Sequence, residues 1–370
     1  MFFASFNMII PEMNNFITQL GGADYKGFVI SLFTLTALLS RPFSGKLADK
    51  VGRVPVMIFG STVCFVSSLI YPLLTSISGF LLLRLAHGFS TGFTPTGQSA
   101  YLSDIIPAER RGEAMGLLGT AGSIGMALGP AIGSNLVQFF SMESMFYCSS
   151  AFAIASVLIL SGIKETLPVK TRFAPGLLKI QRHEWFEPRV IVPCLVMVLG
   201  AYAYGSVFTV ISDFGAYVGI QNKGLLFTCL TIASLVVRLL GGKASDRWGR
   251  KPVLRVSLSL IAISMLVIGM AETPFQLIIG VTLYGFAQGT TSPTLLAWAT
   301  DLSDINHKGK GLSSVYMAME LGIGIGALAS AFIYGNDPGR FFLTFFTCSV
   351  LSTLAFIYLV IPGSRTKATA

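Results

Sequence analysis

The chain has 370 residues, of which 53% are hydrophobic and only 12% are charged, and its formal net charge is +9. Soluble domains carry about 25% charged residues, and the long apolar runs here lack the polar stripe of a helix in a soluble protein. The composition therefore excludes an ordinary soluble domain and indicates an all-α membrane protein. The basic residues are scattered over many turns, which argues against a nucleic-acid partner.

Apolar runs long enough to cross a bilayer follow one another along the whole chain and predict about twelve membrane helices. The first six runs cover residues 2–20, 27–48, 55–73, 79–103, 112–139 and 144–163. The last six cover residues 190–215, 222–245, 252–270, 275–300, 310–334 and 340–361. The first run begins directly at Met1 without a basic flank, unlike a signal peptide. We expect its cytoplasmic end to be clipped.

A polar and basic segment separates the two sets of six runs. It covers residues 164–189 and contains Pro168, Pro175 and Pro188. The sequence therefore predicts an N-terminal six-helix bundle over residues 1–163, a cytoplasmic linker over 164–189 and a C-terminal six-helix bundle over 190–370.

Most of the 26 Lys and Arg residues lie in this linker, at the C-terminus and in every second turn. The side of a membrane that is rich in Lys and Arg is the cytoplasmic one. We therefore expect a multi-pass protein of the cell (inner) membrane with both termini in the cytoplasm.

One short charged turn occurs twice, once in each half of the chain. Its first copy contains Gly45, Asp49, Gly52 and Arg53. Its second copy, 197 residues later, contains Gly242, Asp246, Gly249 and Arg250. The glycines at the second positions permit a tight turn with positive φ, and the aspartates are suited to accept from free N–H groups at a helix start. Two copies of one unit are typical of a transporter built from repeated halves.

Neither a metal site nor a cofactor site is visible in the sequence. The five cysteines lie inside apolar runs and form no CxxC pair, which indicates packed thiols. His183 and His307 lie in separate turns, and no nucleotide or nucleophile motif occurs. We expect no cofactor, no metal and no catalytic residue, so the chain is not predicted to be an enzyme.

The repeated turn resembles the loop signature GxLaDrxGRr of the major facilitator superfamily. Leu81–Gly88 resembles the fourth-helix pattern RxxQG of that family, with His87 in place of the usual Gln. Gly125–Gly133 resembles the fifth-helix pattern GxxxGPxxG, which is associated with drug:proton antiporters of the twelve-helix exporter branch. The first helix departs from the exporter pattern, because Pro11-Glu12-Met13-Asn14 stands where a second Pro is common.

The resemblance implies a cytoplasmic gate made by the two turns. Asp49 would lie at the start of helix eleven near residues 309–313, and Asp246 would lie at the start of helix five near Gly112. Arg53 and Arg250 would then pair with acids at the ends of helices four and ten. The expected gate residues are Gly45, Asp49, Gly52, Arg53, Asp104, Arg111, Gly242, Asp246, Gly249, Arg250 and Asp301.

The glycines of the fifth helix have a physical role that needs no family argument. Their spacing allows close packing between membrane helices, and the proline kinks the helix. The resemblance adds the sealing of one face against ion leak. The residues of this packing motif are Gly125, Gly129, Pro130 and Gly133.

Few ionisable residues lie inside the apolar runs: Glu12, Arg84, His87, Asp213 and Glu320. A charge near mid-bilayer costs at least about 2.5–3.5 kcal/mol, so such residues are candidates for function. We expect Glu12 first and Glu320 second as proton carriers, with Arg84 tuning the local field. Asp213 is equally well read as a surface carboxylate, and His87 as a packing residue.

The function implied by the resemblance is proton-coupled efflux of small amphipathic molecules by alternating access. An importer or facilitator of a small metabolite or sugar is the alternative, and a channel or sensor on a transporter fold is a remote one. The expected partners are a small-molecule substrate, protons and the lipid bilayer, and we expect a monomer. Helices one, four, seven and ten would line the cavity. The cavity candidates are Asn7, Asn14, Phe89, Gln98, Tyr101, Tyr202, Tyr204, Tyr284, Gln288 and Trp298.

Overall fold

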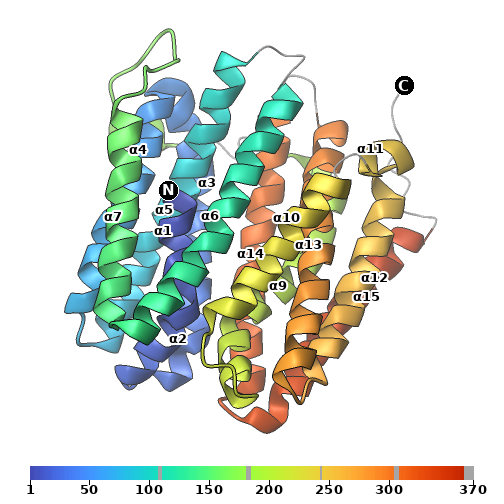
Figure 1. The fold of residues 1–370 in the computed structure, drawn as a ribbon. Coiled ribbons are helices and arrows are strands. Elements are labelled where there is room, and N and C mark those ends of the chain that lie inside the picture. The colour runs from blue at the N-terminus through green and yellow to red at the C-terminus, as the bar shows by residue number, and fades with distance from the viewer. Residues whose placement is uncertain (107–110, 181–184, 242–243, 304–307, 362–370) are drawn as a thin grey trace. The chain divides into compact units, whose positions relative to one another are not determined.

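The computed structural model describes residues 1–106, 111–180, 185–241, 244–303 and 308–361. Across these ranges the chain forms α-helices and short 3-10 turns and no strand. The chain divides into two compact units (Figure 1). The first comprises Met1–Ala23 and Leu32–Arg182, and the second comprises Asp24–Ser31 and His183–Ala370. Each unit is described by itself below.

Within the described residues, seven helices belong to the first half of the chain, and they follow the expected runs closely. They are α1 (Phe2–Met8), α2 (Ile10–Gln19), α3 (Lys26–Lys50), α4 (Arg53–Ile70), α5 (Ile77–Ile105), α6 (Arg111–Phe139) and α7 (Met142–Ser161). The 3-10 turns η1 (Ala23–Tyr25), η2 (Tyr71–Leu73) and η4 (Pro175–Leu178) connect or follow them. The first residues of α3 group with the second unit and the rest of it with the first.

The second half repeats this order. Its helices are α9 (Ile191–Tyr217), α10 (Gly224–Gly241), α11 (Ala244–Trp248), α12 (Arg250–Gly269), α13 (Pro274–Leu302), α14 (Lys308–Tyr334) and α15 (Phe341–Val360). The turns η5 (Pro188–Val190) and η6 (Pro338–Arg340) precede α9 and α15. Eight helices of the described ranges are long and apolar enough to cross a membrane. Together with α1–α2, α5, α10 and α13 they account for the predicted twelve.

The first membrane segment differs from the continuous helix expected over residues 2–20. It is interrupted at Ile9, between the end of α1 and the start of α2. Pro11 explains the break, because its ring has no N–H and collides with the carbonyl of the residue four positions earlier, Asn7. The interruption lies directly before Glu12.

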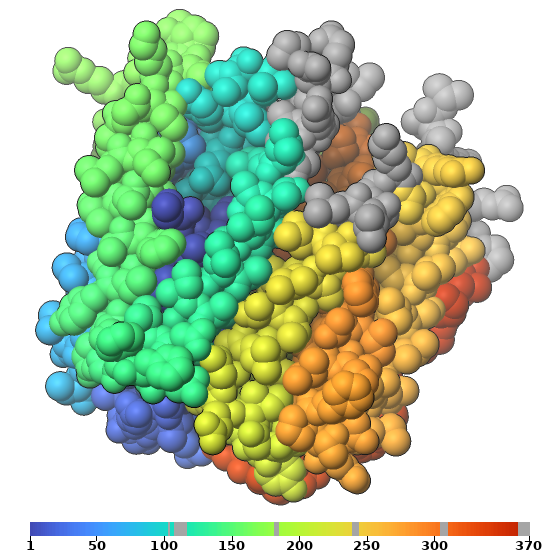
Figure 2. All heavy atoms as spheres, viewed as in Figure 1, coloured from blue at the N-terminus to red at the C-terminus, as the bar shows by residue number. Residues whose placement is uncertain are grey.

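The first unit is a bundle in which α4 packs on α5 and α7, while α1 packs on α6 and α7. Figure 2 shows the first residues of α1, in dark blue, between α6 and α7. Small hydroxyl residues fill the contacts between these helices. Ser5, Ser68 and Ser149 are fully buried, and the Ser149 hydroxyl donates to the Ser5 carbonyl at 2.9 Å. Small residues of this kind let membrane helices approach closely.

The second unit has the same pattern of neighbours. Helix α9 packs on α14 and α15, α12 packs on α13 and α15, and α10 packs on α13. Large apolar side chains point outward in both units, for example Leu82, Leu158 and Val256, which are 66%, 67% and 72% exposed. Such a surface would be unstable in water but matches the hydrocarbon of a bilayer.

Candidate functional site

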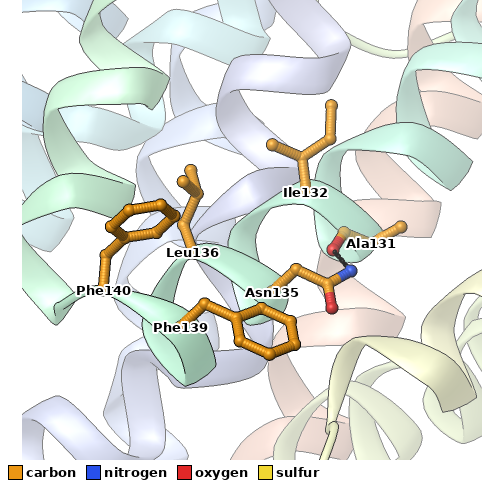
Figure 3. Close-up of a pocket in the computed structure, with 6 residues that line it drawn as sticks. All are labelled: Ala131, Ile132, Asn135, Leu136, Phe139 and Phe140. Atoms are coloured by element: carbon orange, nitrogen blue, oxygen red, sulfur yellow. Dashed lines mark hydrogen bonds between the residues drawn. The ribbon is translucent and has the colours of Figure 1, made fainter.

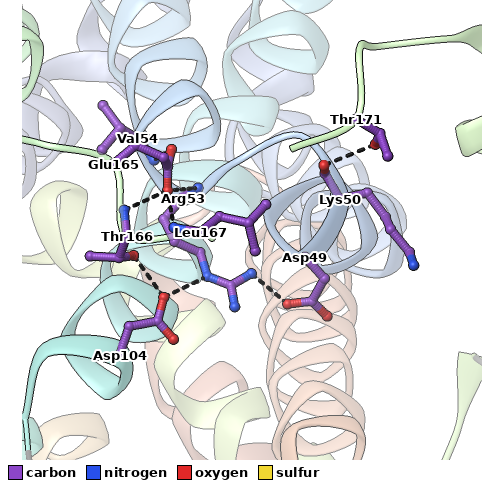
Figure 4. Close-up of polar contacts among 9 residues, drawn as sticks. All are labelled: Asp49, Lys50, Arg53, Val54, Asp104, Glu165, Thr166, Leu167 and Thr171. Atoms are coloured by element: carbon purple, nitrogen blue, oxygen red, sulfur yellow. Dashed lines mark hydrogen bonds and ion pairs between the residues drawn. The ribbon is translucent and has the colours of Figure 1, made fainter. Parts of the chain in front are cut away.

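The first copy of the repeated turn lies between α3 and α4, and Arg53 is at its centre (Figure 4). The Arg53 Nη1 donates to Asp49 Oδ1 at 2.6 Å, and its Nε donates to Asp104 Oδ2 at 3.1 Å. The guanidinium therefore bridges the end of α3 and the end of α5. The expected pairing of Arg53 with Asp104 is confirmed.

The second copy has the same geometry 197 residues later. Arg250 Nε donates to Asp301 Oδ2 at 2.9 Å, and Arg250 Nη1 forms an ion pair with Asp246. Nη1 also donates to the Ser245 hydroxyl at 2.8 Å. The expected pairing of Arg250 with Asp301 is confirmed, and each arginine holds two helix ends together.

The contacts of Gly45, Gly242 and Arg111 in the expected gate stay predictions. A Cβ added to Gly45 would meet open space. Gly242 and the side chain of Arg111 lie outside the described residues. The docking of Asp49 near residues 309–313 and of Asp246 near Gly112 stays a prediction.

Glu165 lies in the linker and binds the first turn, a contact that was not predicted from the sequence. Its Oε1 accepts from the backbone N–H of Arg53, Thr166 and Leu167 at 3.0, 2.9 and 3.0 Å, and its Oε2 accepts from Val54 N–H at 3.0 Å. Burial alone would raise the pKa of Glu165, but these N–H groups together lower it below its usual range. The carboxylate therefore stays charged and caps the start of α4.

Glu12, the preferred proton carrier, is buried in α2, directly after the break in the first membrane segment. Only 4% of Glu12 is exposed, and its Oε1 accepts from the Ser134 hydroxyl of α6 at 3.0 Å. Ionisable side chains are rare inside membrane segments, so a buried carboxyl in this position is a candidate for function.

The glycines of α6 explain why Glu12 and Ser134 lie so close. A Cβ on Gly125 would lie 3.0 Å from the Ala4 N, and one on Gly129 would lie 3.0 Å from the Met8 N. Because side chains would not fit, α1 lies directly against the α6 backbone.

The second unit repeats this contact, and we did not predict this repeat from the sequence. Gly322 and Gly326 of α14 lie 197 residues after Gly125 and Gly129 and face the backbone of α9 near Val198 and Tyr202. These glycines have the same spacing of 197 residues as the two turns, and this spacing could have predicted the repeated contact. Glu320 lies on the same helix and is 6% exposed.

Arg84 and His87 belong to one buried network of the first unit. Arg84 Nη1 donates to the Tyr71 hydroxyl at 3.3 Å, and that oxygen lies 3.2 Å from His87 Nδ1. His87 Nε2 lies 3.5 Å from Cys64 Sγ, and the Arg84 guanidinium lies over the Phe33 ring at 4.7 Å. Tyr71 thus joins two residues that the sequence placed only on one helix face.

Asp213 is neither a free surface carboxylate nor an isolated buried acid. Its Oδ2 lies 2.5 Å from Lys26 Nζ, and both side chains are mostly buried. A role of Asp213 in proton coupling stays a prediction.

The cavity candidates differ in their surroundings. Tyr101 packs against the cluster of Val54, Met57 and Leu160, as a packing residue does. Tyr204 stacks on Phe208 with ring centroids 4.2 Å apart, and Lys251 Nζ lies 5.5 Å from the Trp298 ring centre. A role for the ten candidates in a cavity stays a prediction.

A shallow hollow of about 320 Å³ lies on α6, near the end of that helix (Figure 3). It is lined by Ala131, Ile132, Asn135, Leu136, Phe139 and Phe140. The Asn135 amide donates to the Ala131 carbonyl of its own helix at 2.7 Å. The lining is therefore apolar and includes none of the cavity candidates.

Comparison with known proteins gives consistent matches over most of the chain. The family model described as Major Facilitator Superfamily matches residues 1–221 and 194–370. Multidrug resistance protein 2 of Bacillus subtilis is 28% identical over 334 residues, which is 86% of this chain and 82% of that protein. Multi-drug resistance efflux pump PmrA of Streptococcus pneumoniae is 28% identical over 358 residues, which is 90% of this chain and 86% of that protein.

Solved structures support the fold. The human organic anion transporter MFSD10 matches with a TM-score of 0.75 and 20% identity over 96% of both chains. A D-xylose-proton symporter matches with a TM-score of 0.78 and 15% identity over 97% of this chain and 94% of that one.

Proposed function

Because this chain belongs to the Major Facilitator Superfamily, we propose that it is a proton-coupled exporter of small amphipathic molecules that works by alternating access. The chain is a multi-pass membrane transporter, and relatives that align with most of it are named for multidrug resistance. We further propose that it acts as a monomer in the cell (inner) membrane with both termini in the cytoplasm, as the distribution of Lys and Arg favours.

The observation that carries the proposal is the buried carboxyl of Glu12 beside the Ser134 hydroxyl, at the break between α1 and α2. Backbone irregularity in the middle of a membrane is typical of sites that bind substrates or ions. A carboxyl there is suited to bind a proton from one side and release it to the other as the segment moves.

One proton provides enough energy for this task. A charge that crosses a potential of about 100 mV releases about 2.3 kcal/mol. A tenfold concentration ratio corresponds to about 1.4 kcal/mol. One proton for one neutral molecule therefore maintains a gradient of about forty-fold, so one titrating acid suffices.

The test is transport of an amphipathic cationic dye into inverted vesicles with an imposed pH gradient. Glu12→Gln should abolish accumulation against the gradient while leaving substrate binding and downhill exchange, because glutamine cannot take up and release a proton. Glu143→Gln is the matched control, since Glu143 is an exposed acid in the first turn of α7.

Other outcomes select among the remaining hypotheses. Full proton-driven accumulation in both Glu12→Gln and Glu320→Gln would exclude both as carriers. Accumulation in the opposite direction, or downhill movement alone, would identify an importer or facilitator. Unsaturable flux would identify a channel.

A further inference from the structure

The linker docks on the first copy of the repeated turn through side chains that bind both helix ends. Thr171 donates to the Lys50 carbonyl, the last of α3, with its backbone N at 2.8 Å and its hydroxyl at 2.9 Å. Glu165 accepts from Arg53 and Val54, the first residues of α4. The linker therefore supplies partners to the free carbonyl on one side of the turn and to the free N–H groups on the other (Figure 4).

The start of α4 depends on an external partner. Its N-cap residue is Gly52, which has no side chain to accept a hydrogen bond. Pro55 has no N–H, so Arg53 and Val54 carry the first donors that need a partner. Glu165, more than a hundred residues further along the chain, provides both acceptors.

Thr166 binds Asp104, the same carboxylate that Arg53 binds. Its hydroxyl donates to Asp104 Oδ2 at 2.7 Å, and the same oxygen accepts from Arg53 Nε at 3.1 Å. Glu165 thus fixes the backbone of Arg53, and Thr166 fixes the carboxylate that receives its side chain. Two adjacent linker residues set both partners of one ion pair.

In the sequence, the corresponding positions of the second half do not carry these side chains. Positions 197 residues after Glu165, Thr166 and Thr171 are Pro362, Gly363 and Ala368, and none of these has a polar side chain. The glycines of the two turns reflect the difference. A Cβ on Gly52 would overlap Glu165 Oε2, whereas a Cβ on Gly249 would have Pro252 Cδ at 3.7 Å as its neighbour.

We propose that Glu165, Thr166 and Thr171 form a linker clamp, a set of positioning residues that holds Arg53 in its bridge between Asp49 and Asp104. The clamp makes the first turn of the proposed gate stiffer than the second. It couples the linker to the helix ends that move during transport, and this coupling rests on the proposed function.

Hydrogen exchange tests the clamp without any substrate. In Glu165→Gln, the amide replaces one oxygen and removes the charge, so the peptide that contains residues 53–56 should exchange about fivefold faster, as expected for a lost helix cap. The peptide with residues 250–254 is the internal control and should not change. Equal exchange in wild type and Glu165→Gln would show that Glu165 does not cap α4.

A double-mutant cycle on the unfolding temperature tests the link to Arg53. Thr166→Val removes the hydroxyl and keeps the shape, whereas Thr166→Ser keeps the hydroxyl. Thr166→Val should lower stability in wild type but much less in the Arg53→Lys background, and Thr166→Ser should restore it. Additive effects would contradict a role of Thr166 through Arg53.

The two glycines provide a matched pair. Gly52→Ala and Gly249→Ala both place a side chain at positive φ, 145° and 87°, but only Gly52→Ala also collides with Glu165. Glu165→Ala should therefore reduce the cost of Gly52→Ala and leave that of Gly249→Ala unchanged. Equal behaviour of the two pairs would overturn the clamp at this turn.

Transport then measures what the clamp does in the cycle. Thr166→Val should lower kcat several-fold with little change in KM, because it alters the gate and not substrate binding. Faster exchange and coupled unfolding with unchanged kcat would reject the positioning role in the gate. Failure of wild type to move the amphipathic dye would reject the proposed function but not the clamp, which exchange and unfolding measure independently.

Discussion

At the scale of single residues, the role of an acidic side chain depends on which hydrogen-bond donors surround its carboxyl group. Glu165 receives four backbone N–H groups, so it serves as a fixed charge. Glu12 accepts from the hydroxyl of Ser134. The same residue type therefore stabilises a helix end in one place and is proposed to carry a proton in the other.

The lowered pKa of Glu165 gives a pH dependence with a definite sign. Because the folded pKa lies below the unfolded one, the carboxylate contributes stability above the unfolded value of 4.5 and loses it as pH falls through the folded pKa. The difference in unfolding temperature between wild type and Glu165→Gln should be constant near neutral pH and shrink below about 4.5. A difference that grows on acidification would contradict this assignment.

At the scale of elements, glycine spacing decides which helices touch. Gly125 and Gly129 place α6 against α1, and Gly322 and Gly326 place α14 against α9. The two contacts are repeats of one another, so each half of the chain uses its first and fifth membrane segments in the same way. The buried acids do not follow the repeat, because the position 197 residues after Glu12 is Thr209.

Gly129→Ala should therefore destabilise the first unit. The added Cβ collides with the α1 backbone at Ala4 and Met8, and overpacking of this kind costs about 1–3 kcal/mol. Gly119→Ala on the same helix is the control, since its Cβ meets open space and alanine favours a helix by up to about 1 kcal/mol. Unfolding temperatures in detergent should fall for Gly129→Ala only. A similar response of both variants would remove the packing argument.

At the scale of the whole molecule, each half contains one arginine bridge that ties two helix ends together. Arg53 and Arg250 make the same two ion pairs. Asp49 is 69% exposed and Asp246 is 65% exposed, so each has oxygen surface available for a further partner. In the proposed cycle that partner is a helix start of the other half, bound when the cytoplasmic side closes.

Asp49→Asn should then shift the balance between inward- and outward-open states while keeping the fold. We expect the labelling rate of Gln98→Cys, in a background without the five native cysteines, to change about fivefold, equivalent to about 1 kcal/mol of gate energy. Glu272→Gln, an exposed acid elsewhere, should have no effect. Unchanged labelling and transport in Asp49→Asn would show that Asp49 serves only membrane topology and has no role in the gate.

The sequence by itself determined the twelve segments and the repeat, and its resemblance to the family implied the pairing of Arg53 with Asp104 and of Arg250 with Asp301. Hydropathy determines the segments because a bilayer admits only helices of sufficient length. The break at Ile9 was not predicted, although Pro11 explains it.

Only the tertiary structure decided which distant side chains meet. Glu165 with Arg53, Ser134 with Glu12 and Lys26 with Asp213 are contacts between segments far apart in the chain, and Tyr71 with His87 is a contact between two consecutive segments. Hydropathy and charge patterns act along a segment, whereas these contacts depend on how helix faces turn toward one another when close-packed glycines and serines bring them together.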